Sequence, residues 1–304
     1  EIVFSGVGKT SNEISFAIDK KILLINSESI SEVKEINRIA KLKDKKVMIG
    51  IRLNPNTDAK TLKQISTGKK DNKFGVNSKT FIKLVNYCKS CENIKLRCLS
   101  VHIGSQILDH KPYEQMLKVI DKILDKVNYK FKFIDLGGGM GISYNKNTKK
   151  LNYKKYSLAI KKFLKKHKSK VIFEPGRSII GNTGILISKV IYIKNSEKKS
   201  FVILDSAMND LMRPALYGAK HQILPSVKNF IISKKIYEFV GPICESTDKF
   251  ITLKKFQNLK EKDIVAICDV GAYGMSLSSN YNLRPKPVEL LIKGSKIKVI
   301  RRRQ

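Results

Sequence analysis

The chain has 304 residues, of which 60 are lysine or arginine and 26 are aspartate or glutamate, giving a formal net charge of +34. A chain of this length can hold one large domain or a large and a small one, and its apolar content suffices for a core. No apolar run is long enough to span a bilayer, and no signal-peptide pattern stands at the N-terminus. These features predict a soluble protein that does not partner a membrane.

The positive charge comes mainly from lysines, which are scattered through every segment instead of forming one stripe. Arginine is scarce, and Arg177, Arg213 and Arg284 stand inside the motifs described below, where a planar guanidinium is useful. Without an RNA-module signature, we expect no nucleic-acid partner. The odd number of cysteines, five, favours a reducing, cytoplasmic location. Because Cys88 and Cys91 have no second pair, we predict no metal site.

The first part of the chain alternates apolar strands with amphipathic helices. We expect strands at residues 2–5, 22–26, 47–54, 96–104, 131–136 and 170–173, and helices at 29–42, 78–88, 113–126 and 154–166. Such repeats imply a parallel sheet with its helices outside. Polar or glycine residues follow every strand, which is typical of a TIM-type α/β barrel. A closed barrel has eight strand–helix units and six are visible. Either the sheet is open, or two units are missing.

The pattern changes after residue 177. Short apolar runs separated by turns occupy residues 180–183, 190–194, 201–204, 231–240, 263–267, 288–291 and 295–301. Such runs, without long helices between them, predict an antiparallel β-domain. We therefore expect a partial barrel at residues 1–183 and a β-domain at residues 184–304, with the boundary near Thr183.

Two stretches that directly follow predicted strands carry candidate site residues. The triple glycine at residues 137–139 lets backbone N–H groups approach an anion closely. Glu174 and Arg177 bring opposite charges to the same edge of the sheet. A phosphate-bearing cofactor is the natural ligand of such an edge.

Three stretches of the β-domain are too polar and too specific in residue type to be ordinary turns. Residues 208–217 place Arg213 and Tyr217 four positions apart, and residues 241–248 place Cys244 beside Glu245. Residues 269–274 present Tyr273 between small residues, where little else can crowd a ligand.

These stretches belong to an ordered set of motifs that resembles the diaminopimelate decarboxylases, pyridoxal-phosphate enzymes that make lysine. In chain order the motifs are IVFSGVGKT (2–10), TGKKDNKFG (67–75), HIGSQ (102–106), DLGGG (135–139), EPGR (174–177), MNDLMRPALY (208–217), GPICES (241–246) and GAYGMSLSSNYNLRP (271–285). The resemblance covers essentially the whole chain. It implies an eight-stranded α/β barrel followed by a β-domain, working as a homodimer with shared active sites. The implied reaction is decarboxylation of meso-2,6-diaminopimelate to L-lysine, the last step of lysine biosynthesis.

One motif of the family does not occur in this sequence. The lysine that forms the Schiff base with the cofactor ends the first barrel strand of the family, in a Tyr-Ala-x-Lys-Ala-Asn-like stretch. The chain resembles the family from the third barrel strand onward, so we expect the two missing units, and that lysine, upstream of Glu1. The C-terminus also looks clipped, at Gln304. Lys9 follows a different strand and is expected to be a loop residue.

The resemblance also implies the residues that hold pyridoxal 5'-phosphate. Glu174 faces the pyridine nitrogen and keeps it protonated, and His102 stacks on the ring. The full cofactor set is His102, Ser105, Gly137, Gly138, Gly139, Glu174, Gly176, Arg177 and Tyr273. A strand-ending solvated acid at residue 174 and a tight strand–helix turn at the glycines are the alternatives for these residues.

The implied substrate set is Arg177, Arg213, Tyr217, Glu245 and Tyr273. Diaminopimelate has an ammonium and a carboxylate at each end, and Arg213 and Glu245 fit the distal pair. Cys244 is the implied proton donor to the substrate Cα, on a stretch that reaches the partner subunit's site. The implied catalytic residues are therefore Cys244, Glu174 and His102. Salt bridges between domains and an inert buried thiol are the alternative roles.

Other functions of the same fold remain open. Ornithine, arginine and carboxynorspermidine decarboxylases handle a distal amine or guanidine, and Arg213 would find no distal carboxylate in ornithine. A non-catalytic cofactor-binding remnant is the alternative from another class.

Overall fold

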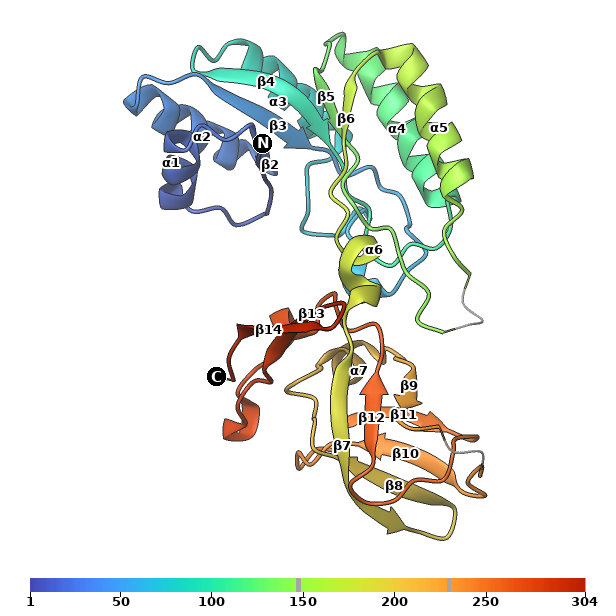
Figure 1. The fold of residues 1–304 in the computed structure, drawn as a ribbon. Coiled ribbons are helices and arrows are strands. Elements are labelled where there is room, and N and C mark those ends of the chain that lie inside the picture. Colours follow the sequence, from blue (N-terminus) through green and yellow to red (C-terminus); the bar gives the residue numbers. More distant parts are fainter. Residues whose placement is uncertain (146–148, 229–230, 304) are drawn as a thin grey trace. The chain divides into compact units, whose positions relative to one another are not determined.

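The structure is a computed structural model, and it describes residues 1–145, 149–228 and 231–303. The chain divides into two compact units (Figure 1). Unit 1 comprises Glu1–Gly141 and Lys150–Gly176, and unit 2 comprises Ile142–Lys149 and Arg177–Gln304. The division thus falls inside the motif at residues 174–177. The domain boundary near Thr183 stays a prediction.

Unit 1 is built on a six-stranded parallel sheet whose strand order follows the chain, β1-β2-β3-β4-β5-β6. Its strands are β1 (Val3–Phe4), β2 (Leu24–Ser27), β3 (Val47–Arg52), β4 (Ile94–Ser100), β5 (Phe133–Asp135) and β6 (Lys170–Ile172). All six predicted strands are therefore present, each shorter than or shifted slightly from the predicted range.

A helix follows each of these strands. The helices are α1 (Ser11–Asp19), α2 (Ile30–Leu42), α3 (Ser78–Lys89), α4 (Lys111–Val127), α5 (Tyr153–His167) and the short α6 (Arg177–Ile180), with a 3₁₀ turn η1 (Lys63–Ile65) before α3. Helices α4 and α5 run side by side next to β5 and β6 (Figure 1). Among the residues that the structure describes, none of the helices combines the length and hydropathy that a membrane crossing needs.

Local signals explain where the helices begin. Thr10 closes a capping box with Glu13 at α1, and the side chains of Ser29 and Asn77 accept backbone N–H bonds at α2 and α3. Such caps satisfy N–H groups that would otherwise lack partners. Helix α1 is absent from the sequence predictions, although Thr10 and Glu13 carry its signature.

The sheet of unit 1 is apolar on both faces. Ile25, Leu99 and Ile134 pack with the helices, whereas their neighbours Leu24, Cys98 and Phe133 form a separate small cluster on the opposite face. Successive strand residues point to opposite faces, so both faces are covered. The opposite cluster has the position of the interior of a barrel.

The sheet is strongly curled. Ser5 follows β1 and Glu174 follows β6, at opposite edges of the strand order, yet the Ser5 Oγ donates a hydrogen bond to Glu174 Oε1 at 3.1 Å. A flat sheet of six strands would separate these residues by several strand spacings of about 4.8 Å. Unit 1 is therefore a half-barrel of six strands, and the last helix of the six strand–helix repeats, α6, falls in unit 2.

Unit 2 carries a second six-stranded sheet, ordered β11-β10-β8-β7-β12-β9, and a two-stranded sheet, β13-β14. The strands are β7 (Leu186–Asn195), β8 (Lys199–Leu204), β9 (Ile223–Pro225), β10 (Ile236–Val240), β11 (Lys249–Leu253), β12 (Ile264–Ile267), β13 (Glu289–Lys293) and β14 (Lys296–Arg301). Neighbours are antiparallel, as predicted, except that β8 and β10 run parallel. Strands β9 and β11 are absent from the sequence predictions.

One predicted strand of unit 2 is wrong. Residues 180–183 end α6 and form a 3₁₀ turn, η2 (Gly181–Thr183). Ile179 and Ile180 suggest a strand by their residue type, but both side chains are exposed and no strand of the described residues pairs with them. Residue preference for strands depends on packing against neighbours, which this segment lacks.

Candidate functional site

The carboxyl edge of the half-barrel, where β1–β6 end, carries a connected set of polar side chains. Glu174 accepts the Ser5 hydroxyl, and Ser5 in turn accepts the Asn26 amide at 3.1 Å. The same amide donates to Asp135 Oδ2 at 2.8 Å. Residues from β2 and β5 and from the ends of β1 and β6 thus meet at this edge.

Asp135 is the buried centre of the set. It is 0% exposed, and its carboxylate accepts the Gly137 N–H at 2.9 Å, the Ser100 hydroxyl at 3.2 Å and the Asn26 amide. Burial raises the pKa of Asp135, while these donors favour its charged form. Desolvation also raises the pKa of Glu174, and the negative charge of Asp135 adds to that rise. Since Asp135 has more donors, we place the proton of the pair on Glu174.

His102 is held in one tautomer at the same edge. The Gly138 N–H donates to His102 Nδ1 at 3.1 Å, so Nδ1 carries no proton and the neutral ring has its N–H at Nε2. Burial, with a smaller contribution from the charge of Arg52, lowers the pKa of His102 to about 4. The imidazole is therefore neutral at physiological pH.

The triple glycine is required by close packing of backbone. A Cβ on Gly138 would lie 2.1 Å from the Glu174 carbonyl oxygen, and one on Gly139 would lie 2.2 Å from that of Gly104. Gly137 and Gly139 also have positive φ, at 62° and 89°. The N–H groups of the first two glycines are bonded to Asp135 and His102, so within the described chain only the Gly139 N–H of the three lacks a partner.

Ser105 and Gly176 lie after β4 and β6. The backbone of Ser105 is fixed because its N–H donates to Ile65 at 3.0 Å and its carbonyl accepts the Thr61 hydroxyl at 2.7 Å. Gly176 is exposed at the end of unit 1.

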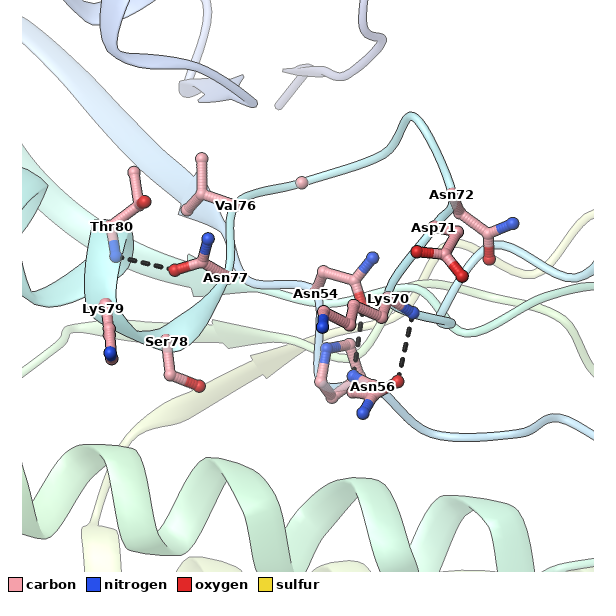
Figure 2. Close-up of a pocket in the computed structure, with 12 residues that line it drawn as sticks. Asn54, Asn56, Lys70, Asp71, Asn72, Val76, Asn77, Ser78, Lys79 and Thr80 are labelled. Carbon is pink, nitrogen blue, oxygen red and sulfur yellow. Dashed lines mark hydrogen bonds between the residues drawn. The ribbon is translucent and has the colours of Figure 1, made fainter.

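A polar cavity of about 750 Å³ lies between β3 and α3 (Figure 2). Asn54, Asn56 and Lys70 line one side of the cavity. Asn77 also lines it, and its side chain caps α3 by accepting the Thr80 N–H at 2.9 Å. None of the residues that the sequence predicts for the site lines this cavity.

In unit 2, two arginines meet at one tyrosine. The guanidinium of Arg213 lies over the Tyr144 ring at 4.6 Å, and Arg177 donates to the Tyr144 hydroxyl. The Arg177 guanidinium also lies 4.9 Å from the centre of the Tyr273 ring. The structure thus brings the predicted residues Arg177, Arg213 and Tyr273 into one cluster.

Arg213 has an uncharged partner. Its Nη1 lies 2.7 Å from His221 Nε2, and no carboxylate pairs with it among the residues that the structure describes. Arg213 is 5% exposed, and its buried Nε has no hydrogen-bond partner in that part of the chain. The guanidinium therefore retains its charge and unused donors.

Cys244 and Glu245 lie on an exposed turn. The Asn282 amide donates to the Cys244 thiol at 3.6 Å. Glu245 accepts the hydroxyls of Thr247, at 3.1 Å, and of Tyr281. Glu245 has no cationic partner in the described structure.

Asp248 holds this turn in shape from within. It is buried, and its carboxylate accepts the Ile243 N–H at 2.8 Å and the Met208 N–H at 2.7 Å. A Cβ on Gly241 would lie 2.3 Å from Asp248 Oδ2. Asp248 therefore ties the segments that carry Cys244 and Arg213 to each other.

The two predicted tyrosines differ in their backbone. Tyr273 has a φ of 58°, which is costly for a residue with a side chain, and the residue is 44% exposed. Tyr217 ends α7 (Arg213–Tyr217) in ordinary helical geometry and is half-buried.

Sequence reasoning assigned no role to Asp135, Tyr144, His221 or Asp248. Asp135 and Asp248 lie inside or directly beside quoted motifs, so their acidity next to glycine or polar turns was the available signal. No local pattern marks Tyr144, whose partners are distant in sequence, and an eight-residue spacing from Arg213 in a non-repetitive segment gives His221 no recognisable signature either.

The family model described as "Pyridoxal-dependent decarboxylase, pyridoxal binding domain" matches residues 1–181. A diaminopimelate decarboxylase of Aquifex aeolicus is 39% identical over 306 residues, covering 100% of this chain and 73% of the relative. One of Helicobacter pylori is 42% identical over 308 residues, covering 100% and 75%.

Solved structures agree with these sequence matches. The crystal structure of the Helicobacter pylori diaminopimelate decarboxylase complexed with L-lysine superposes with a TM-score of 0.94 at 42% identity. The match covers 100% of this chain and 76% of that structure. The fold of the half-barrel followed by β-sheets is therefore that of these decarboxylases.

Proposed function

We propose that this chain, which belongs to the pyridoxal-dependent decarboxylases and within them to the diaminopimelate decarboxylases, removes one carboxylate from meso-diaminopimelate to give L-lysine. The observation that carries the proposal is Arg213, a buried guanidinium whose partner is neutral and which no described carboxylate neutralises. A diaminopimelate molecule offers such a guanidinium a second, distal carboxylate.

The residues of the carboxyl edge fit pyridoxal phosphate. Glu174 offers a solvent-accessible carboxyl group, His102 a neutral ring and Gly139 an unused backbone N–H. When bound, pyridoxal phosphate provides the electron sink for the electron pair that the departing CO2 leaves behind.

The proposed role of Glu174 is to keep the pyridine nitrogen of the cofactor protonated. Its raised pKa means that it holds a proton readily, and Ser5 orients Oε1 by donating to it. A carboxyl group of this kind shares a proton with the pyridine nitrogen and keeps positive charge there. Asp135, which is buried behind it, fixes the polar network from which Glu174 projects.

The remaining residues of the cofactor set are proposed to bind pyridoxal phosphate and to orient its ring. His102 presents one ring face because Gly138 fixes its tautomer. The proposed phosphate ligands are Ser105, Gly139, Gly176, Arg177 and Tyr273. Gly137 and Gly138, which the sequence also suggested as phosphate ligands, have their N–H groups bonded to Asp135 and His102, so their part is to let the backbone pack closely at this edge. Arg177, which lies beside Tyr273, supplies the positive charge.

The distal end of the substrate is proposed to bind Arg213 and Glu245. Arg213 takes the carboxylate with its free donors, and Glu245, which has no described cationic partner, takes the ammonium. Tyr217, at the end of the helix that begins with Arg213, lines the same substrate region.

Cys244 is the proposed proton donor to the substrate Cα. Its thiol is exposed, as a group that acts on a ligand must be, and it lies on a turn that Asp248 shapes. We propose that the protein is a cytoplasmic homodimer in which Cys244 of one copy serves the cofactor bound by the other.

Ornithine, arginine or carboxynorspermidine decarboxylation is the second candidate, since these reactions share the fold. Arg213 disfavours it, because a distal amine or guanidine would face a buried guanidinium of like charge. A non-catalytic cofactor-binding protein is the remaining possibility.

The test is an assay of the full-length protein with pyridoxal phosphate, in which CO2 and lysine are measured with meso-diaminopimelate, ornithine and arginine as separate substrates. We expect lysine and CO2 from diaminopimelate alone, and loss of both in Glu174→Gln. Turnover of ornithine or arginine in its place would establish the second candidate. Cofactor binding without turnover of any substrate would establish the non-catalytic one.

A further inference from the structure

His221 has a single tautomer that the structure determines. It lies between α7 and β9, is 1% exposed, and its Nδ1 is 2.8 Å from the carbonyl oxygen of Cys268. A carbonyl oxygen only accepts, so Nδ1 carries the proton and donates. The other nitrogen, Nε2, then has a lone pair available for Arg213.

The Arg213 contact requires that lone pair. Nη1 of Arg213 lies 2.7 Å from His221 Nε2, and a guanidinium only donates hydrogen bonds. Burial, with smaller contributions from the charges of Arg213 and Arg177, lowers the pKa of His221 to about 4. His221 is therefore a neutral acceptor.

A neutral acceptor orients a cation without cancelling its charge. A carboxylate in the place of His221 would form an ion pair with Arg213 and compete with any anionic ligand. Tyr144 completes the arrangement, because its ring lies under the Arg213 guanidinium at 4.6 Å and packs edge-on against His221 at 5.1 Å. Tyr144 thus covers one face of the guanidinium and His221 holds Nη1. The buried Nε lacks a partner among the described residues.

We infer that His221 is a positioning residue, which holds the Arg213 guanidinium by accepting from Nη1 so that its remaining donors and its full charge serve the distal carboxylate of the substrate. This inference rests on the proposed function, since it concerns the carboxylate that distinguishes diaminopimelate from a diamine. His221 itself does not touch the substrate; it acts through Arg213.

Two substitutions separate this role from a merely structural one. In His221→Asn the shorter amide can still donate to the Cys268 carbonyl but does not reach Arg213. In His221→Gln the longer amide places its oxygen where Nε2 stands and can accept from Arg213. A structural role through Cys268 predicts that Asn is the better replacement, whereas the positioning role predicts that Gln is.

The kinetic test uses the full-length, cofactor-loaded enzyme with meso-diaminopimelate. His221→Asn should raise KM about 10-fold, the usual worth of a hydrogen bond to a charged group, while kcat changes much less. His221→Gln should restore most of the wild-type KM. The control is His110→Gln, a histidine of unit 1 that lies beside Asp109 and Glu114 and should leave both constants unchanged. A wild-type KM in His221→Asn, or a higher KM in Gln than in Asn, would overturn the inference.

A second measurement does not depend on turnover. The guanidinium N–H signal of Arg213, assigned in ¹⁵N-edited NMR spectra by its loss in Arg213→Lys, should exchange slowly with water in the wild type and in His221→Gln. It should exchange much faster in His221→Asn. If the wild type fails to decarboxylate diaminopimelate, the proposed function falls, and this spectrum still decides whether His221 positions Arg213. Equal exchange in all three proteins would reject the positioning role whatever the assay shows.

Discussion

Asp135 and Glu174 form a pair of carboxyl groups in which the charge of Asp135 raises the pKa of Glu174. Burial is the main cause of the raised pKa of Glu174. The carboxylate of Asp135, which is 0% exposed and accepts three donors, raises that pKa further by its charge. A carboxyl group with a raised pKa is a suitable partner for a pyridine nitrogen, with which it can share a proton. The pKa of the acid that the sequence singles out is therefore raised partly by an acid to which the sequence analysis gave no role.

This pair predicts an unusual pH dependence of stability. Folding raises the pKa of Glu174 above its usual 4.5, so the folded protein holds a proton that the unfolded chain has released. Stability contributed by that proton is full below the unfolded pKa and is lost as pH rises through the folded pKa. Glu174→Gln should therefore raise the free energy of unfolding of the apoprotein at neutral pH and flatten its fall with pH.

The measurement is urea unfolding of the apoprotein across a pH series. Glu35→Gln is the matched control, because Arg38 and Ser11 lower the pKa of Glu35 to about 2 and its stabilising effect is lost as pH falls. The two glutamine variants should thus change the pH slope in opposite directions. Identical slopes in Glu174→Gln and wild type would show that Glu174 has no raised pKa.

The proposed role of Cys244 as proton donor predicts an effect on kcat. If its thiol donates the proton to Cα, Cys244→Ala should lower kcat of the full-length enzyme by roughly 10²–10⁴-fold and leave the affinity for pyridoxal phosphate unchanged. Cys91→Ala is the control, since that thiol only donates to the Tyr87 carbonyl on unit 1. Wild-type kcat in Cys244→Ala would remove the thiol from the reaction.

At the residue level, the sequence identifies functional residues that stand in motifs, but it does not identify the residues outside those motifs that bond to them and orient them. Glu174 and Arg213 could be named because glycine, proline or aromatic neighbours set them apart. His221 could not, since its significance depends on a 2.7 Å contact with Arg213 and a carbonyl forty-seven positions away. A buried acceptor has no signature in its own sequence neighbourhood.

At the level of elements, the triple glycine joins β5 to its neighbours by backbone packing. Gly138 does not have a positive φ, so its backbone conformation would accept a side chain. A substitution there is opposed only by a steric clash, because the new Cβ would lie 2.1 Å from the Glu174 carbonyl oxygen. The segment that carries Glu174 must then move.

Gly138→Ala should therefore lower the free energy of unfolding by about 1–3 kcal/mol, the usual cost of overpacking, and weaken cofactor binding. Gly8→Ala is the matched control, since a Cβ there meets nothing within 4 Å, and it should change stability by less than about 1 kcal/mol. Urea unfolding and cofactor titration measure both effects. Equal stability of the two variants would show that the edge relaxes around the added methyl group.

Elements with strong periodicity and caps could be predicted, and those decided by packing could not. Helices α2, α3, α4 and α5 appear within a few residues of their predicted ranges. Residues 180–183 form a turn because Ile180 and the preceding Ile179 have no described strand to pair with. Strand β9 has only three residues, and β11 is a five-residue strand beside a polar turn, so their pairing with β12 and β10 defines them.

At the level of the molecule, the six strand–helix units follow from alternation along the chain, but the curl of their sheet does not. The curl is visible in the approach of Ser5 to Glu174, at opposite ends of the strand order. It brings Asn26 of β2 and Asp135 of β5 together with the residues that follow β1 and β6, which alternation alone leaves as separate strand ends. A parallel sheet predicted from sequence therefore acquires a site only through its curvature.

The proposed homodimer makes the last prediction, because Glu174 lies in unit 1 and Cys244 in unit 2. If Cys244 of one copy serves the cofactor of its partner, a Glu174→Gln chain and a Cys244→Ala chain break different halves of the same kind of site. A mixed dimer then has one site with both defects and one with neither. Random mixing of equal amounts should restore about a quarter of the wild-type activity, although each variant alone is inactive. If each site draws both residues from one chain, mixing restores nothing, and the shared-site proposal fails. Refolding the two variants together, with each refolded alone as the control, decides between these outcomes.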